Sequence, residues 1–168
     1  MNKSAFLLLS EKLSYDSKAI VLEDVTLAVE HPDLYMEKYQ DRLEERGIDE
    51  PVEELAWISL VDVLIEHKLA FEVDWKATGI YVCDVVDILL HRKKISLIDW
   101  EEFEDEDYSD MPSDQFFQIV ANKLSEVNLA LTYLDIDSDC YVLIVVPIED
   151  MSEIKRLAQE AEVTIGEF

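Results

Sequence analysis

The hydrophobic period changes partway along this chain of 168 residues, and that change limits its fold more than any other feature. Up to about residue 67 the apolar residues recur at helical spacing, which predicts helices at 3–13, 17–30, 33–46 and 51–67. From Leu69 to Trp75 large apolar residues alternate with small or acidic ones, which is the period of a strand with one buried face. Helices followed by strands favour an α+β fold over one in which strands and helices alternate.

The remainder of the chain predicts three more helices and a β-hairpin. Helical spacing places the helices at 79–91, 113–127 and 150–161. Asp150 and Glu153 form a capping-box pattern at the start of the last one. The hairpin strands are expected near 129–134 and 141–146, and residues 163–165 are a candidate for a last short strand.

These elements predict one globular domain over residues 1–168, in which helices cover one face of a small, mostly antiparallel sheet. The strand at 141–146 is apolar on both faces, as an inner strand covered by helices would be. The helix at 51–67 has little polar surface and is expected to be the central, mostly buried one. We expect Trp75 to lie in the core rather than in the wall of a ligand pocket.

Glycine is scarce, with only Gly47, Gly79 and Gly166 in the chain. A loop that cradles phosphate groups needs several glycines close together, so that backbone N–H groups can approach the ligand. A P-loop and a dinucleotide-binding crossover are therefore excluded. Gly47 stands where the helix at 33–46 would need a left-handed residue to end.

The charge of the chain excludes further classes of partner. There are 39 Asp and Glu against 14 Lys and Arg, for a formal net charge of −25. A field of that sign repels nucleic acid and anionic membranes, and it attracts cations and basic proteins. No apolar stretch reaches the roughly 18 residues that would cross a membrane. Cys83 and Cys140 each stand beside large apolar residues, so we expect two reduced, buried thiols in a cytoplasmic protein.

Acidic residues concentrate in a loop predicted at 101–110, where six of the seven residues from Glu101 to Asp107 are Asp or Glu. Such runs are usually solvated loops. Aromatic residues are interleaved here, and aromatics often anchor interfaces, so the segment is also a candidate docking surface for a basic protein. The residues of that candidate surface are Trp100, Glu101, Glu102, Phe103, Glu104, Asp105, Glu106, Asp107 and Tyr108.

Asp135, Asp137 and Asp139 are the sharpest candidates for metal ligands, because carboxylates at this spacing can converge on a hard cation. The rest of a calcium loop is missing, since Cys140 stands where the turn needs glycine. The alternatives are a polar hairpin turn, a weak site for Mg²⁺, Mn²⁺ or Ca²⁺, and a catalytic metal site. No other cofactor is expected. His31, His67 and His91 fall at predicted helix ends, where an imidazolium is mildly favourable.

Three segments together resemble a family of acidic bacterial proteins known only as a domain of unknown function. They are Leu43–Pro51 leading to Trp57, then Val73–Lys76, and then Leu134–Leu143. The resemblance extends from about residue 33 onward and implies a soluble, single-domain bacterial protein. It supplies no activity and no catalytic residues.

From these observations we expect a non-catalytic binding or regulatory module whose acidic surface engages a basic protein, as immunity proteins and nuclease inhibitors do. The alternative is an enzyme or sensor that depends on a divalent cation held by the aspartates at 135–139.

Overall fold

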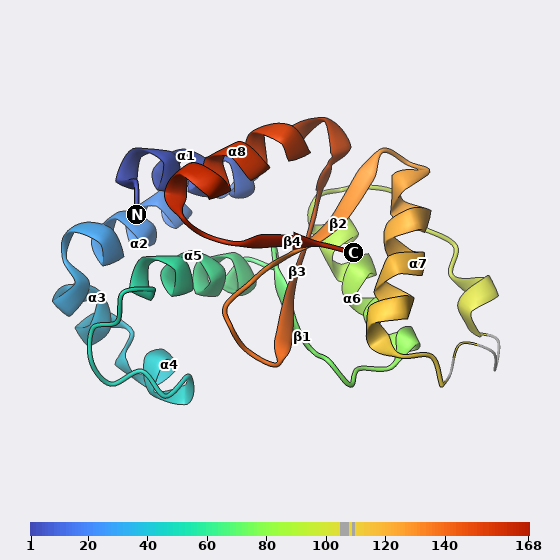
Figure 1. Cartoon of the computed structure of the whole chain (residues 1–168), viewed down its shortest axis with the longest axis horizontal. Coiled ribbons are helices and arrows are strands. Elements are labelled where there is room, and N and C mark those ends of the chain that lie inside the picture. The colour runs from blue at the N-terminus through green and yellow to red at the C-terminus, as the bar shows by residue number, and fades with distance from the viewer. Residues whose placement is uncertain (105–107, 109) are drawn as a thin grey trace.

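A four-stranded antiparallel sheet lies between two groups of helices in the computed structural model of this chain, which describes residues 1–104, 108 and 110–168 (Figure 1). The strands are β1 (Phe71–Asp74), β2 (Leu129–Leu134), β3 (Cys140–Pro147) and β4 (Ile165–Glu167). The α-helices are α1 (Lys3–Leu13), α2 (Lys18–Glu30), α3 (Pro32–Lys38), α4 (Gln40–Glu45), α5 (Leu55–Glu66), α6 (Gly79–Arg92), α7 (Ser113–Ser125) and α8 (Met151–Ala161). Short 3₁₀ turns are η1 (Glu101–Glu104) and η3 (Ile148–Asp150). The predicted α+β class is confirmed.

Strand β3 is one of the two inner strands, as its apolar sequence predicted. The strand order is β1-β3-β2-β4, and β3 pairs with β1 from Cys140 to Leu143 and with β2 from Val142 to Pro147. Successive side chains of β3 enter different cores, because a strand directs neighbouring residues to opposite faces. Val142, Ile144 and Val146 belong to one core, and Leu143 and Val145 belong to the other.

Helices cover both faces of the sheet, so the prediction that they cover one face is wrong. The first core packs α1, α2, α5 and α8 against one face, and the second packs α6 and α7 against the other (Figure 1). A strand that is apolar on both sides requires this arrangement, because either face left open would expose several large side chains to water. None of the helices among the described residues has the length and apolar content to cross a membrane.

Several boundaries differ from the predicted ones for local reasons. The predicted helix at 33–46 is divided at Tyr39, whose hydroxyl donates to Asp24 in α2 at 2.6 Å. Helix α5 begins at Leu55 rather than at residue 51, and it is the central buried helix that was predicted. Gly47 has a φ of +74°, so it is the left-handed residue that follows α4. The fourth strand forms two residues later than predicted, at Ile165–Glu167.

The capping box predicted at the start of α8 does not form. The carboxylate of Asp150 makes no capping hydrogen bond to the backbone of the helix. Instead, Asp150 and Glu153 each lie 2.9 Å from the ammonium of Lys12 in α1. Both acids therefore join α8 to α1.

Lys93 follows α6 and reaches the sheet, where its ammonium donates to the carbonyl of Val145 at 2.5 Å. Burial, and to a smaller extent the charge of Arg92, lower the pKa of Lys93 to about 8. An unfolded lysine has a pKa of about 10.4. Between pH 8 and about 10.4 the unfolded state therefore binds more protons than the folded state at this site, and the contribution of Lys93 to stability rises with pH.

We expect the melting temperature of the wild type, relative to that of Lys93→Met, to increase as the pH is raised from about 7 to 10. A change of about 1 kcal/mol corresponds to roughly 2–4 °C for a chain of this size. Thermal melts followed by circular dichroism measure the difference between the two melting temperatures at each pH. The titration of all other groups affects both proteins equally, so it cancels in this difference. Lys94→Met controls for the loss of one exposed ammonium. A difference that stays flat over this range, or that falls, would contradict the partial burial of the Lys93 ammonium against β3.

Candidate functional site

The loop that joins β2 to β3, residues 135–139, lies at one end of the sheet and is held in a fixed conformation. A carboxylate oxygen of Asp135 accepts the backbone N–H of Asp137 at 2.9 Å, and Asp137 is left-handed with a φ of +54°. The indole N–H of Trp57 in α5 donates to the carbonyl of Asp135 at 2.7 Å. The backbone N–H of Asp135 donates to the carbonyl of Thr164 at 3.0 Å. The loop is therefore tied both to α5 and to the segment that leads into β4.

The three predicted metal ligands do not converge. Asp135 uses its carboxylate in the turn just described. Across the described residues, which include Asp135, Asp137 and Asp139, no three acidic, histidine or cysteine side chains group as ligands for a metal ion. The loop is a polar hairpin turn in this conformation, and a cation site at these three aspartates stays a prediction.

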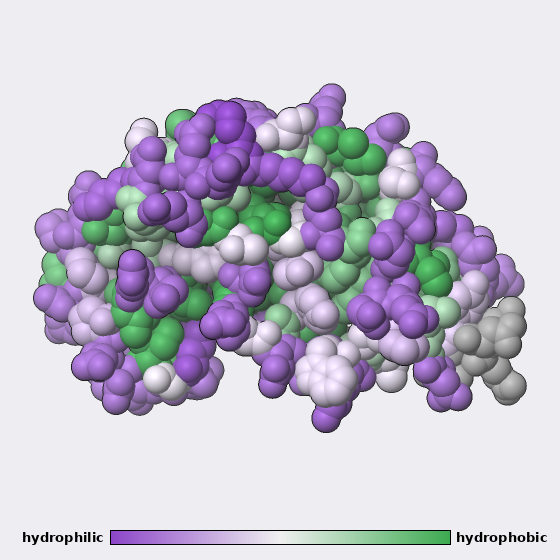
Figure 2. All heavy atoms as spheres, in the orientation of Figure 1, coloured by the Kyte–Doolittle hydropathy of each residue, from purple (hydrophilic) through white to green (hydrophobic). Residues whose placement is uncertain are grey.

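An apolar hollow of about 570 Å³ lies between this loop and the segment that joins α4 to α5. We call it the hairpin groove. Its apolar lining consists of Ile48, Val52, Trp57, Ile58 and Ile136, and its charged rim consists of Glu54, Asp135 and Asp137. Figure 2 shows green apolar surface over the segment between α4 and α5, bordered by purple hydrophilic residues. Val52 is 37% exposed, so apolar surface in the groove is open to solvent.

The rim carboxylates carry uncompensated charge. In the part of the chain that the structure describes, neither Glu54 nor Asp135 nor Asp137 forms an ion pair with a basic group. An unpaired carboxylate beside apolar surface has a stronger field than one in open water, because the apolar wall lowers the local dielectric constant. The groove therefore combines exposed apolar surface with an attraction for positive charge.

A second hollow, of about 670 Å³, differs because its two arginines are paired with acidic residues. It is lined by Tyr39, Arg42, Arg46, Asp62 and Glu72, among others. Arg46 contacts Asp62 at 2.6 Å and Glu72 at 3.0 Å, and Arg42 contacts Asp62 at 3.4 Å. Because Arg42 and Arg46 pair with Asp62, Glu66 and Glu72, this cluster joins α4 to α5 rather than offering its arginines to a ligand.

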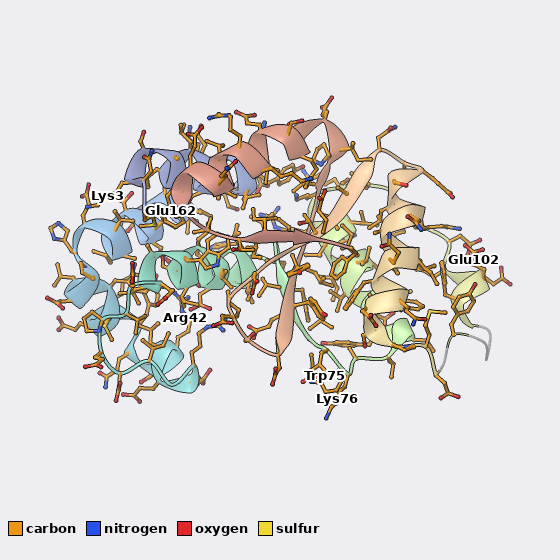
Figure 3. All side chains as sticks on the ribbon, in the orientation of Figure 1. Lys3, Arg42, Trp75, Lys76, Glu102 and Glu162 are labelled. Atoms are coloured by element: carbon orange, nitrogen blue, oxygen red, sulfur yellow. The ribbon has the colours of Figure 1, made fainter. Side chains whose placement is uncertain are left out.

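Trp75 does not lie in the core, and that prediction is wrong. The last residue pair between β1 and β3 is Asp74 with Cys140, so Trp75 stands just beyond the ladder. Its side chain is 51% exposed, and Figure 3 shows it beside Lys76 at the lower edge of the molecule. It lines a hollow of about 440 Å³. The pocket-wall alternative, rejected from the sequence, describes its position.

The aromatic residues of the acidic segment face inward. Phe103 is only 6% exposed, and its ring centroid lies 5.7 Å from that of Trp100, 5.3 Å from that of Tyr108 and 5.7 Å from that of Phe116 in α7. The indole N–H of Trp100 donates to Asp87 in α6 at 2.7 Å. These rings extend the second core, and Phe103 offers almost no surface to a partner.

The first two acidic residues of the segment that begins at Glu101 do not follow its aromatic residues into the core. Glu101 and Glu102 are exposed, and Glu102 pairs with Lys123 in α7. The backbone of Glu104 ends η1. The predictions for Asp105, Glu106 and Asp107 fall outside the described residues. A docking role for this acidic surface stays a prediction.

The cysteines and histidines occupy structural positions. Cys83 is buried and Cys140 is only half-buried, and both are free thiols. Burial raises the pKa of Cys83 to about 12 and also raises that of Cys140, which keeps both protonated at neutral pH. As predicted, the histidines fall at helix ends: His31 and His67 follow α2 and α5, and His91 is in the last turn of α6.

A family model described as Domain of unknown function (DUF6630) matches residues 5–168. The match extends further toward the N-terminus than the three segments that carry the resemblance in the sequence. No curated protein and no solved structure gives a match to this chain.

Proposed function

This chain belongs to the DUF6630 family, and we propose that it acts as a protein-binding module whose hairpin groove takes a basic, amphipathic segment of a partner protein. The observation that carries the proposal is the ring of unpaired carboxylates around exposed apolar surface. An apolar side chain of the partner would enter the groove, while its lysines or arginines would meet Glu54, Asp135 and Asp137.

A basic protein suits this site better than a metal ion. A divalent cation needs several oxygen ligands within about 2.6 Å of one point, and the carboxylates do not converge in that way. An extended partner can instead satisfy separate carboxylates with separate basic side chains. The net charge of −25 adds long-range steering, which should make association fast and sensitive to salt.

We expect neutralisation of two rim acids, in Glu54→Gln/Asp137→Asn, to raise the dissociation constant of a leucine- and lysine-rich helical peptide about tenfold, or about 1.4 kcal/mol. Asparagine tolerates the left-handed backbone of Asp137, so the turn should persist. Fluorescence anisotropy of the labelled peptide at physiological ionic strength measures the change.

A matched control separates a specific site from attraction to overall charge. Glu126→Gln/Glu149→Gln has the same net charge as the rim variant, but its exposed acids lie at the opposite end of the β2–β3 hairpin. We expect this control to change the dissociation constant by less than about twofold. Equal losses in the two variants would show that the peptide responds only to net charge.

The apolar part of the groove has its own test. Val52→Ser removes exposed apolar surface without changing charge or the core. It should weaken binding while leaving the dependence on salt concentration unchanged, because no ionic contact is lost. Unchanged affinity in this variant would contradict insertion of an apolar side chain.

A further inference from the structure

We propose that the hollow beside Trp75 is a recognition site for an arginine side chain. This proposal rests on the proposed function in one respect, namely that the basic partner supplies the arginine. The site lies next to the start of β3 and shares no lining residue with the hairpin groove. Its lining includes Trp75, Lys76, Asp110, Asp114 and Tyr141.

The backbone fixes Trp75 in an outward position. Its N–H donates to the carbonyl of Asp139 at 3.3 Å, and the N–H of the next residue, Lys76, donates to the carboxylate of Asp74 at 2.7 Å. The floor of the hollow is held as well, since the hydroxyl of Ser113 in α7 donates to the carbonyl of Ala77 at 3.1 Å. An aromatic ring held half-exposed on a fixed backbone has a low entropic cost of binding.

The ring of Trp75 already holds a cation. The ammonium of Lys76 lies 4.8 Å from the centroid of the indole, within the range of a cation–π contact (Figure 3). Arginine stacks on aromatic faces better than lysine does, because its guanidinium is planar and more weakly hydrated. A partner's arginine could therefore take the ring from Lys76, which is free to turn into solvent.

Two carboxylates complete the site. Asp110 and Asp114 line the same hollow, and within the described residues neither is paired with a basic side chain. A guanidinium offers five N–H donors in a plane, so it can donate to a carboxylate at its edge while its face rests on the indole. An aromatic face next to unpaired carboxylates suits arginine better than it suits a metal ion or an apolar group.

N-acetyl-arginine amide is the probe, and ¹H–¹⁵N spectra of the full chain are the measurement. The indole signal of Trp75, identified by its loss in Trp75→Phe, should shift saturably with a dissociation constant in the millimolar range. N-acetyl-citrulline amide has the same shape without the charge, and it should leave the signal unmoved. Asp110→Asn/Asp114→Asn should weaken the arginine response about tenfold, whereas Glu126→Gln/Glu149→Gln should change it less than twofold.

Lys76→Gln removes the competing cation and should tighten binding about threefold. Lys3→Gln changes the net charge equally at a distant site, which Figure 3 shows far from Trp75, and it should have little effect. No saturable shift at Trp75 in either the wild type or Lys76→Gln would overturn the proposal, and so would an equal response to the citrulline analogue. Because this probe does not need the groove, a failure here leaves the peptide experiment intact, and the reverse also holds.

Discussion

Asp62→Asn is expected to destabilise the fold by about 3–5 kcal/mol, the largest loss that we predict for a single polar residue. Asp62 is only 4% exposed and lies within the apolar sequence of α5. One of its carboxylate oxygens accepts two hydrogen bonds from Arg46, at 2.6 and 2.9 Å. The other lies 3.4 Å from Nε of Arg42, and neither of these two atoms has a hydrogen-bond partner.

The loss arises from the arginines as much as from the aspartate. Both guanidiniums are partly buried, and without Asp62 they would keep only Glu66 and Glu72 as charged partners. A buried charge that loses its counter-ion retains its desolvation cost without compensation. The cluster also connects α4 to α5, so its disruption should loosen the segment that carries Ile48 and Val52 in the hairpin groove.

Urea unfolding followed by circular dichroism measures this effect. Glu66→Gln is the control, because it removes the exposed partner of Arg42 and should cost less than about 1 kcal/mol. A free energy of unfolding for Asp62→Asn within 1 kcal/mol of the wild type would mean that the cluster does not hold α4 in place.

Phe103→Ala should cost about 3–5 kcal/mol, the usual range for truncation of a buried phenylalanine. Its ring packs among three other aromatic rings, and no small side chain can fill that space. The loss would release the acidic segment from α7. This result would assign Phe103 to the core and would leave only the acids of the segment available to a partner.

Phe103→Leu, which keeps much of the apolar volume, should recover a large part of the loss. Glu102→Gln, in the same turn but exposed, should cost under about 1 kcal/mol. If Phe103→Ala were as stable as the wild type yet bound a basic partner less tightly, the residue would be an interface anchor, as its sequence context suggested.

The secondary structure was largely predictable from the sequence, because it depends on local period. Strand β2 occupies Leu129–Leu134 as predicted, and α6 follows the spacing of polar residues in its sequence. The error at Trp75 has a simple cause. Alternation continues in the sequence after the strand has ended, and the sequence does not show that pairing with β3 stops at Asp74.

The candidate sites were less predictable, because they combine distant segments. The hairpin groove needs Ile48 and Ile136 to meet, and no local pattern indicates this. The inward position of Phe103 depends on contact with Phe116, which is 13 positions further along the chain. One signal was present in the sequence: Asp62 interrupts the apolar face of the predicted central helix, and a buried carboxylate requires a basic partner.

The central claim is that the hairpin groove, rather than the acidic surface as a whole, binds the basic segment. The most direct test is to titrate the leucine- and lysine-rich peptide into ¹⁵N-labelled protein at physiological ionic strength and to map the shifted backbone amides. The account predicts saturable shifts that concentrate at Ile48, Val52, Trp57 and the loop at 135–139, and that need about tenfold more peptide in Glu54→Gln/Asp137→Asn. Shifts spread over all the acidic surfaces, or confined to the segment near Glu101, would contradict it.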